Sequence, residues 1–354
     1  MLAAACGPES SREAITDPSQ QARIKPPAAP SFVGQDLGVL PGDNQSSGFG
    51  VNSAGRVVGQ SASGTGGVRG FYWDGSLHNL TTAGAQGAAY AVSSGAQAYA
   101  VGYERSPGQD NRAVVWTLPS LVPAVLDQGP SNAFGVNDAG DAVGTYCYSG
   151  CGTSASVWHG VIWGAGGSGR TDIEPLPGYG YTYGSDINND GIVVGASYGP
   201  GFERRAYLRM TSGALVALPP LAPFPYSDAT AVSDVVGGQV HVAGFSRTES
   251  GFEFGQALRW TVEVSTGQIT STLALDQRWA EGVNAAGDVA GTGGSSSVPA
   301  ATLWRSGVYS ALKAPKGGFG SVSRGMARGT GTPTYVVGET SIRSSPRALR
   351  WVIQ

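Results

Sequence analysis

The sequence is poor in charge, in cysteine and in histidine. Only 13% of its 354 residues are charged, the formal net charge is -3, and there are three cysteines and three histidines. Proteins that bind nucleic acid usually carry a basic patch, so this charge balance argues against a nucleic-acid partner. The chain also has no run of 18 apolar residues, so no membrane-spanning helix is expected.

Glycine is the residue in excess. The 56 glycines are more than twice the usual ~7%, and they do not fall at every third position, which excludes collagen. Hydrophobic residues make up 41% of the chain, enough to form a core, so gross disorder is not expected. Many glycines among many Val, Ala and aromatic residues indicate short strands joined by tight turns.

The N-terminal sequence predicts a targeting signal followed by a linker. Residues 1–6 read MLAAAC. Small residues directly before a cysteine resemble the lipobox of bacterial lipoproteins, which makes Cys6 the candidate lipidation site and residues 1–6 the remnant of a signal peptide. The alternative is a chance cysteine in an alanine-rich leader. Residues 7–32 are polar and proline-rich without apolar periodicity, so a disordered tether is expected.

The remaining two cysteines are consistent with export. Cys147 and Cys151 are separated by three residues that include a glycine, and they can close a small disulfide loop in an oxidising compartment. The alternative is half of a zinc site, which needs two further ligands, and the three histidines are widely scattered. We therefore expect a bacterial lipoprotein of the outer membrane or cell envelope, or an extracellular protein, that meets the membrane only through its lipid.

Two phrases recur along the chain. The first has the form small-Φ-Asn-x-x-Gly-x-Val-Val-Gly and is clearest as GVNSAGRVVG (50–59), GVNDAGDAVG (135–144), DINNDGIVVG (186–195) and GVNAAGDVAG (282–291). Its seven copies end, at steps of 42 to 51 residues, at Gly59, Gly102, Gly144, Gly195, Gly244, Gly291 and Gly338. The second phrase ends in tryptophan in six of the seven units, as in RGFYW (69–73) and HGVIW (159–163). The tryptophans are expected to pack between repeats.

Each unit reads as four short antiparallel strands. Asn-x-x-Gly is a tight turn between strands one and two, the Trp phrase is strand three, and a short apolar run after it is strand four. A lone sheet of this size cannot bury both faces, whereas a closed ring of such sheets can. The sequence therefore predicts an all-β fold, a seven-bladed β-propeller of four-stranded antiparallel blades over residues 33–354.

The chain ends predict how the ring closes. The last unit stops at strand three, and residues 35–41, QDLGVLP, have the look of a strand four that precedes the first unit. The N-terminal strand should therefore pair beside Trp351 and complete the last blade, which removes two exposed edges.

The repeat resembles that of the HAF-repeat family of bacterial extracellular proteins, whose units read roughly GINxxGxVVG…HAFxW. His159-Gly160-Val161-Ile162-Trp163 is closest to the tripeptide that names the family, while most units carry Arg at the histidine position. The resemblance covers about residues 36–354 and implies export and a repeat fold, without any known reaction.

One stretch carries possible cation ligands. Asp186, Asn188 and Asp190, followed by Gly191, fit the start of a D-x-N-x-D-G calcium loop, although the later ligand positions hold Val194 and Ser197. The alternative is that they form this unit's copy of the Asn-x-x-Gly turn. No other cofactor is expected.

Two sets of side chains could carry function on the face where the two-to-three and four-to-one loops emerge, here called the loop face. Loops on a rigid scaffold commonly bind ligands, and aromatic rings stack on sugars or partner side chains. The candidate binding residues are Tyr146, Tyr148, Trp158, Tyr179, Tyr181, Tyr226, Arg278 and Trp279. The alternative is that these rings only pack the long loops against the ring.

The second set is acidic. Asp186, Asp228, Asp276 and Glu281 could approach one another at the mouth of the ring, and a carboxylate pair can hydrolyse or eliminate glycosides. No nucleophile elbow or phosphate loop is present. The function expected first is a monomeric, surface-tethered binding or adhesion module for a glycan or protein. A carbohydrate-active lyase or hydrolase is the alternative, and a scaffold for partner proteins is a third reading.

Overall fold

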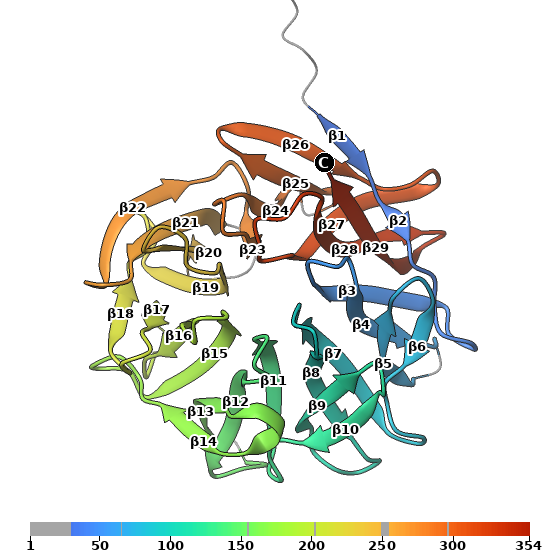
Figure 1. Cartoon of the computed structure of the whole chain (residues 1–354), viewed down its shortest axis with the longest axis horizontal. Helices are drawn as coiled ribbons and strands as arrows, with labels where there is room; N and C mark the ends of the chain where they lie inside the picture. The colour runs from blue at the N-terminus through green and yellow to red at the C-terminus, as the bar shows by residue number, and fades with distance from the viewer. Residues whose placement is uncertain (1–29, 65, 154–155, 202, 249–254, 296) are drawn as a thin grey trace, which may run out of the picture.

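The computed structural model describes residues 30–64, 66–153, 156–201, 203–248, 255–295 and 297–354. Within them, seven antiparallel sheets stand as blades around a central axis (Figure 1), so the predicted seven-bladed β-propeller is confirmed. The expected remnant at residues 1–6, Cys6 and most of the expected tether lie outside the described residues. No helix of the described part is long and apolar enough to cross a membrane.

The first strand of each unit lies nearest the axis and the last at the rim (Figure 1). Blades one to three comprise β3 (Gln45–Val51), β4 (Val57–Ala62), β5 (Val68–Trp73) and β6 (Leu77–Asn79); β7 (Gln86–Val92), β8 (Ala98–Arg105), β9 (Arg112–Leu118) and β10 (Val122–Val125); and β11 (Ser131–Val136), β12 (Ala142–Ser149), β13 (Val157–Trp163) and β14 (Arg170–Ile173). Blades four and five comprise β15 (Tyr181–Ile187), β16 (Val193–Tyr198), β17 (Arg204–Arg209) and β18 (Leu215–Leu218), and β19 (Tyr226–Val232), β20 (Gln239–Arg247), β21 (Gly255–Glu263) and β22 (Gln268–Ala274).

The last two blades include strands from both ends of the chain. Blade six comprises β23 (Trp279–Val283), β24 (Val289–Gly294), β25 (Pro299–Arg305) and β26 (Val308–Lys313), with β1 (Ser31–Val33) added at its rim. Blade seven comprises β27 (Gly318–Met326), β28 (Thr334–Ile342), β29 (Ser345–Ile353) and β2 (Gln35–Asp36).

The core is divided among the interfaces between blades. The buried apolar residues form one cluster at each of the seven interfaces between neighbouring sheets. The strand-three tryptophans lie in these clusters, and Trp116, Trp163, Trp260 and Trp351 are at most 1% exposed. Truncating such a ring to alanine typically costs about 3–5 kcal/mol. The recurrence of tryptophan is thus explained by packing between blades.

The ring closes as the sequence predicts. Gln35 and Asp36 pair antiparallel with Arg350 and Leu349, and the Asp36 carboxylate lies 3.2 Å from the Arg347 guanidinium. Because the last strand of blade seven comes from the other end of the chain, the ring is held shut by hydrogen bonds instead of a covalent link.

A second N-terminal strand was not predicted. Ser31 and Phe32, which the sequence assigned to the tether, belong to β1 and run parallel to β26, with Ser31 opposite Ala311. The tether boundary at residue 32 is therefore corrected to residue 30 or earlier. Phe32 packs against the cluster between blades six and seven, so its apolar ring favours an ordered strand. The N-terminal segment thus joins blade six to blade seven.

Candidate functional site

A cavity of about 240 Å³ lies on the axis between the innermost strands. In every blade the pairing of the first strand with the second shifts by one residue, which is a β-bulge. A bulge leaves one residue unpaired and re-aims its side chain. The unpaired residues all line this cavity, here called the channel, and in blade order they are Phe49, Tyr90, Phe134, Ser185, Thr230, Glu281 and Arg324.

The glycine that ends each repeat phrase makes room for this bulge. A Cβ at Gly144 would collide with the carbonyl oxygen of Asn132, and one at Gly195 with the carbonyl oxygen of Tyr183. The other five copies stand against a strand-one carbonyl in the same way. Any side chain there would push the first strand away, so the repeated glycine is required for the ring of channel residues.

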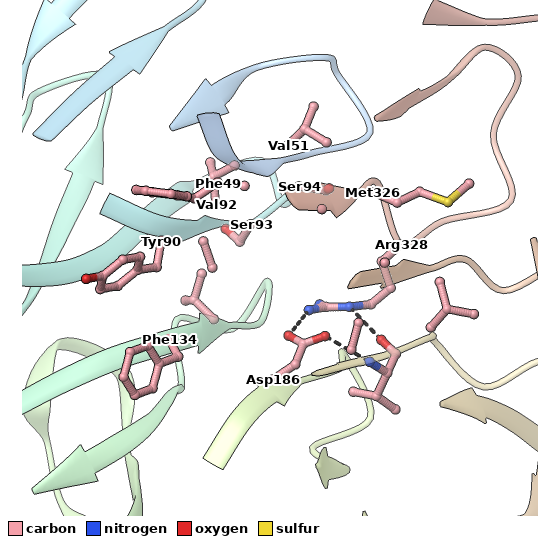
Figure 2. Close-up of a pocket in the computed structure, with 18 of the residues that line it drawn as sticks. Phe49, Val51, Tyr90, Val92, Ser93, Ser94, Phe134, Asp186, Met326 and Arg328 are labelled. Carbon is pink, nitrogen blue, oxygen red and sulfur yellow. Dashed lines mark hydrogen bonds and ion pairs between the residues drawn. The ribbon is translucent and has the colours of Figure 1, made fainter. Parts of the chain in front are cut away.

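Aromatic rings form one side of the channel. The ring centroids of Phe49 and Tyr90 are 5.5 Å apart, and those of Tyr90 and Phe134 are 5.4 Å apart. Figure 2 shows these three rings gathered on the side opposite Arg328. Burial raises the pKa of Tyr90 to about 12, so its phenol is neutral at physiological pH.

An ion pair crosses the channel from blade seven to blade four (Figure 2). Arg328 Nη2 donates to Asp186 Oδ1 at 2.6 Å, and Arg328 Nε donates to the carbonyl oxygen of Val232 at 3.1 Å. The backbone N–H of Val232 donates to Asp186 Oδ2 at 3.0 Å. Desolvation raises the pKa of the Asp186 carboxyl, and the nearby Arg328 opposes that shift.

A second charged group lies between blades six and seven. Arg324 Nη2 is 2.8 Å from Glu339 Oε1, while Glu281 Oε2 is buried without a hydrogen-bond partner among the described residues. Desolvation raises the pKa of Glu281 to about 7; Arg324 opposes this shift and Glu339 adds to it. Glu281 is therefore close to half-protonated at neutral pH.

A larger cavity, of about 830 Å³, opens on the loop face beside blades three and four. We call it the aromatic pocket because Trp158, Tyr181, Tyr183 and Tyr198 line it, together with Arg204. Phe134, Ser185 and Thr230 line both this pocket and the channel, so the two cavities adjoin.

A buried polar network around Asp228 contacts the rings of the aromatic pocket. The Tyr183 hydroxyl and Asp228 Oδ1 are 3.1 Å apart, Arg204 Nη1 lies 3.4 Å from the same oxygen, and Arg247 Nε is 3.2 Å from Oδ2. The Arg204 guanidinium also lies 4.5 Å from the Tyr198 ring centroid. Desolvation, followed by the charge of Asp228, raises the pKa of Tyr183, so its hydroxyl stays protonated. This network holds two of the pocket rings in place.

A disulfide fixes the hairpin that carries Trp158. Cys147 and Cys151 are bonded, with 5.8 Å between their Cα atoms, which is compatible with the pairing expected from the sequence. Cys147 lies opposite Trp158 in the pairing of β12 with β13. The link therefore shortens the loop directly beside a pocket residue.

Of the eight candidate binding residues, Trp158 and Tyr181 line the aromatic pocket. Tyr146 is 5% exposed, belongs to the cluster between blades two and three, and donates to Asp172 Oδ2 at 2.7 Å. Tyr148 is 59% exposed and stacks on His159, with 4.4 Å between centroids. Successive residues of a strand face opposite sides, so Trp158 faces blade four whereas His159 and its partner Tyr148 face blade two.

The remaining candidates lie elsewhere on the ring. Tyr179 packs against the apolar cluster between blades three and four, as the packing alternative predicted for it. Tyr226 begins β19 in blade five, and Trp279 begins β23 in blade six directly after Arg278. None of these four residues lines the aromatic pocket in the described part of the chain. The aromatic loop residues thus share a face without sharing one site.

The three candidate cation ligands serve the turn between β15 and β16. Asn188 Oδ1 accepts from the N–H groups of Asp190 and Ile192, and its Nδ2 donates to the Ser233 carbonyl at 2.8 Å. Asp190 Oδ2 accepts from the backbone N–H of Val235 in blade five at 3.0 Å, and Asp186 forms an ion pair with Arg328. No group of three or more His, Cys, Asp or Glu that could hold a metal occurs among the described residues.

The four acidic candidates occupy different surroundings. Asp186 and Asp228 are each bound by arginine, Glu281 faces the channel, and Asp276 is exposed in the loop before blade six. A glycosidase needs one carboxyl group to act on the leaving oxygen and another to act on the sugar carbon. Two of the four carboxylates are engaged by guanidinium groups, so fewer of them are available for these two catalytic roles than the sequence suggested.

Sequence reasoning missed Tyr183 and six of the seven channel residues, all but Glu281, although a signal for each was present. Tyr183 is two residues beyond Tyr181 in one strand, so the two rings must share a face. Each channel residue stands three positions before the Asn position of the repeat, as Phe134 does before Asn137. What the spacing could not reveal is the bulge that turns this position inward.

No family model and no curated protein matches the chain. Among solved structures it is similar to a puromycin-hydrolyzing peptidase of Mycobacterium tuberculosis, with a TM-score of 0.56 and 11% identity over 91% of this chain and 54% of that one. A prolyl endopeptidase has a TM-score of 0.54 and 11% identity over 87% of this chain and 50% of that one. An acylaminoacyl peptidase of Pyrococcus horikoshii has a TM-score of 0.53 and 11% identity over 88% of this chain and 51% of that one.

The likeness is one of fold. The chain spans about half the length of these peptidases, and at 11% identity the similarity shows the propeller and carries no activity with it. The resemblance to HAF-repeat proteins stays a prediction.

Proposed function

We propose that this β-propeller is a binding module that holds a glycan in the aromatic pocket of blades three and four. The observation that carries the proposal is the convergence of Trp158, Tyr181, Tyr183 and Tyr198 on one cavity of about 830 Å³ at the loop face. Two of these rings come from blade four's innermost strand, one from its second strand and one from blade three.

The chemistry of the lining suits a sugar. Sugar rings present apolar C–H faces that pack on aromatic side chains and hydroxyl groups that need hydrogen-bond partners. Hydroxyls of Thr145 and Ser156 and the Arg204 guanidinium lie among the rings. A concave cavity of this size favours one or a few sugar units over a protein partner, because a protein interface needs a broader surface of about 800 Å² on each side.

We further propose that the protein is exported and is a HAF-repeat lipoprotein anchored through Cys6. Support comes from the lipobox-like start, the repeat phrase and the Cys147–Cys151 disulfide, which persists best in an oxidising compartment. Metabolic labelling with a fatty-acid probe should mark the wild-type chain and not Cys6→Ala. Equal labelling of both would contradict the anchor.

The binding proposal is tested with the full chain on a glycan array, followed by calorimetry on the best glycan. The double variant Trp158→Ala/Tyr181→Ala should lose at least about fivefold and up to about 150-fold in affinity, since each lost stacking contact is worth roughly 0.5–1.5 kcal/mol. The matched control is Tyr148→Ala/Trp279→Ala, which removes the same two ring types from the loop face outside the pocket and should change affinity less than twofold.

Two outcomes would overturn the proposal. Equal glycan binding by both double variants would move the site away from the aromatic pocket. An array without any bound glycan, together with an envelope protein whose capture requires Trp158 and Tyr181, would replace the glycan by a protein partner.

A further inference from the structure

The channel differs from the aromatic pocket in size and in chemistry. The seven bulge residues occupy equivalent positions and therefore form one ring around the axis, within the cavity of about 240 Å³. Three adjacent blades contribute aromatic rings, the next two contribute hydroxyls, and the last two contribute Glu281 and Arg324. The ring is thus apolar on one side and charged on the other.

The charges of the channel do not balance. Arg328 is paired with Asp186 at 2.6 Å, and Arg324 is paired with Glu339 at 2.8 Å. Glu281 is left over, with Oε2 buried and without a hydrogen-bond partner among the described residues. A buried carboxylate oxygen without a partner is costly and calls for an explanation, and a bound ligand that balances the charge of Glu281 provides one.

We propose that the channel is a second binding site, which takes a small organic ammonium ion between the aromatic rings of Phe49, Tyr90 and Phe134 and the carboxylate of Glu281. Aromatic faces attract organic cations through the ring quadrupole, most strongly where the cation is removed from water. A carboxylate on the opposite side supplies the counter-charge. This inference is independent of the glycan proposal.

Other ligand classes fit the channel less well. An anion would meet Glu281 and Glu339 and find both guanidinium groups already paired. A metal ion would lack ligands, because the described residues contain no group of three metal-binding side chains. The ligand can enter from the loop face, where the channel adjoins the aromatic pocket at Phe134, Ser185 and Thr230.

The pH dependence of binding distinguishes these classes. The pKa of Glu281 is raised to about 7 by desolvation, with Arg324 lowering it and Glu339 raising it. The other charged groups that line the channel are Asp138, Asp186, Asp234 and Arg328. A cation binds the ionised form of Glu281, so its affinity should rise from pH 6 to pH 8 and then level off. An anion would show the opposite slope.

The experiment is calorimetric titration of the full chain with choline and with its uncharged isostere 3,3-dimethyl-1-butanol. Choline should saturate one site with an affinity that increases from pH 6 to pH 8, and the isostere should bind at least about tenfold more weakly. Glu281→Gln should lose at least about tenfold in choline affinity and all of the pH dependence, whereas Glu174→Gln, the same change at an exposed carboxylate, should lose nothing. Tyr90→Leu should also weaken choline binding.

Several results would overturn the inference: no saturable choline binding at pH 8, equal binding of the isostere, unchanged affinity in Glu281→Gln, or an affinity that rises as the pH falls. Should Glu281→Gln fail to fold, the isostere and the pH profile of the wild-type chain still decide. The double variant Trp158→Ala/Tyr181→Ala should keep its choline affinity, so failure of the channel site and failure of the glycan pocket are separately visible.

Discussion

The face opposite the loop face, here called the turn face, repeats hydrogen bonds between the turns of neighbouring blades. Near the loop face, strand-three N–H groups such as those of Ala113, Gly160 and Ala206 also donate to a serine or threonine hydroxyl of the next blade, but the aromatic side chains there differ from blade to blade. On the turn face, the residue after the Asn position of one blade donates its N–H to the side chain at the same position of the next blade. The links, at 2.6 to 3.1 Å, join Ser53, Ser94, Asp138, Asn189 and Asp234 in that order.

This series of hydrogen bonds between turns changes in blades six and seven, where the equivalent position no longer holds Ser, Asp or Asn. Ala285 holds the equivalent position in blade six, and its N–H bonds instead to the backbone carbonyl of Arg328. Arg328 holds the same position in blade seven, and its side chain crosses the channel to Asp186.

On the loop face, by contrast, the aromatic pocket gathers four rings from blades three and four. Tyr226 and Trp279, which hold the positions of Tyr181 and Tyr183 in blades five and six, do not line it among the described residues. Hydrogen bonds between blades stabilise the ring at both faces, and the aromatic side chains of the loop face are free to vary and bind.

Opening the ring should have the largest effect, because the structure of both faces depends on its closure. A chain that begins at Gly42 lacks β1, β2 and the buried side chains of Leu37 and Leu40. We expect a loss of about 5 kcal/mol, from two buried leucines and the strand pairings, and a melting temperature lower by about 10 °C. Thermal unfolding followed by circular dichroism measures it, and a chain that melts as the parent does would contradict the closure.

A turn-face substitution should lower stability and leave binding intact. Asn188→Ala removes two hydrogen bonds accepted within the turn and one donated to Ser233, from a side chain that is fully buried. The expected loss is about 3 kcal/mol in urea-induced unfolding. Asn189→Ala, the exposed neighbour, is the control and should lose less than about 1 kcal/mol.

Glycan affinity completes this comparison. Because Asn188 lies on the turn face, the Asn188→Ala variant should bind the glycan as tightly as the wild type under conditions in which it remains folded. A fall in affinity without unfolding would show that the two faces are coupled.

The channel between the two faces should show its effect through pH. The folded-state pKa of Glu281, about 7, lies above its ordinary value of 4.5. The folded chain therefore holds an extra proton between these values, and the corresponding stability is full below about pH 4.5 and lost as the pH rises through 7. Glu281→Gln does not titrate.

Denaturation curves of the wild type and Glu281→Gln should therefore coincide near pH 4.5 and separate at higher pH. At pH 8 the variant should be more stable by roughly 3 kcal/mol. A difference that does not depend on pH would refute the raised pKa.

The smallest expected change in stability comes from the loop face. Replacing Cys147 and Cys151 together by serine opens a loop of only a few residues, so the free energy of unfolding should fall by less than about 2 kcal/mol. Because the disulfide lies beside Trp158, glycan affinity should fall about tenfold. A large loss of stability with unchanged affinity would reverse the roles assigned to the two faces.

Much of the fold could be predicted because the same pattern of strands and turns recurs seven times in the sequence. The Asn-x-x-Gly phrase placed a turn at Gly55, and the structure has a positive φ of 73° there. The closure by Asp36 followed from counting strands. The strand β1 could not be predicted in this way, because Ser31–Val33 has no copy elsewhere and its partner lies in blade six.

The candidate site was predicted less completely, for a reason visible in blade three. Tyr146, Tyr148 and Trp158 lie close in sequence, yet Tyr146 is packed between blades two and three while Trp158 faces the aromatic pocket. Which side of a strand a ring takes depends on register, and a bulge between Cys147 and Ser149 shifts that register.

The sequence by itself determined the number of blades, the buried tryptophans and the manner of closure, because packing between identical units demands the same residue at the same place each time. Only the tertiary structure decided that Phe134 and Glu281, 147 positions apart, line one cavity and that Arg328 reaches Asp186 across it. Such pairs occur once, and their contact is set by ring geometry and bulges, whose long-range distances leave no periodic trace in the chain.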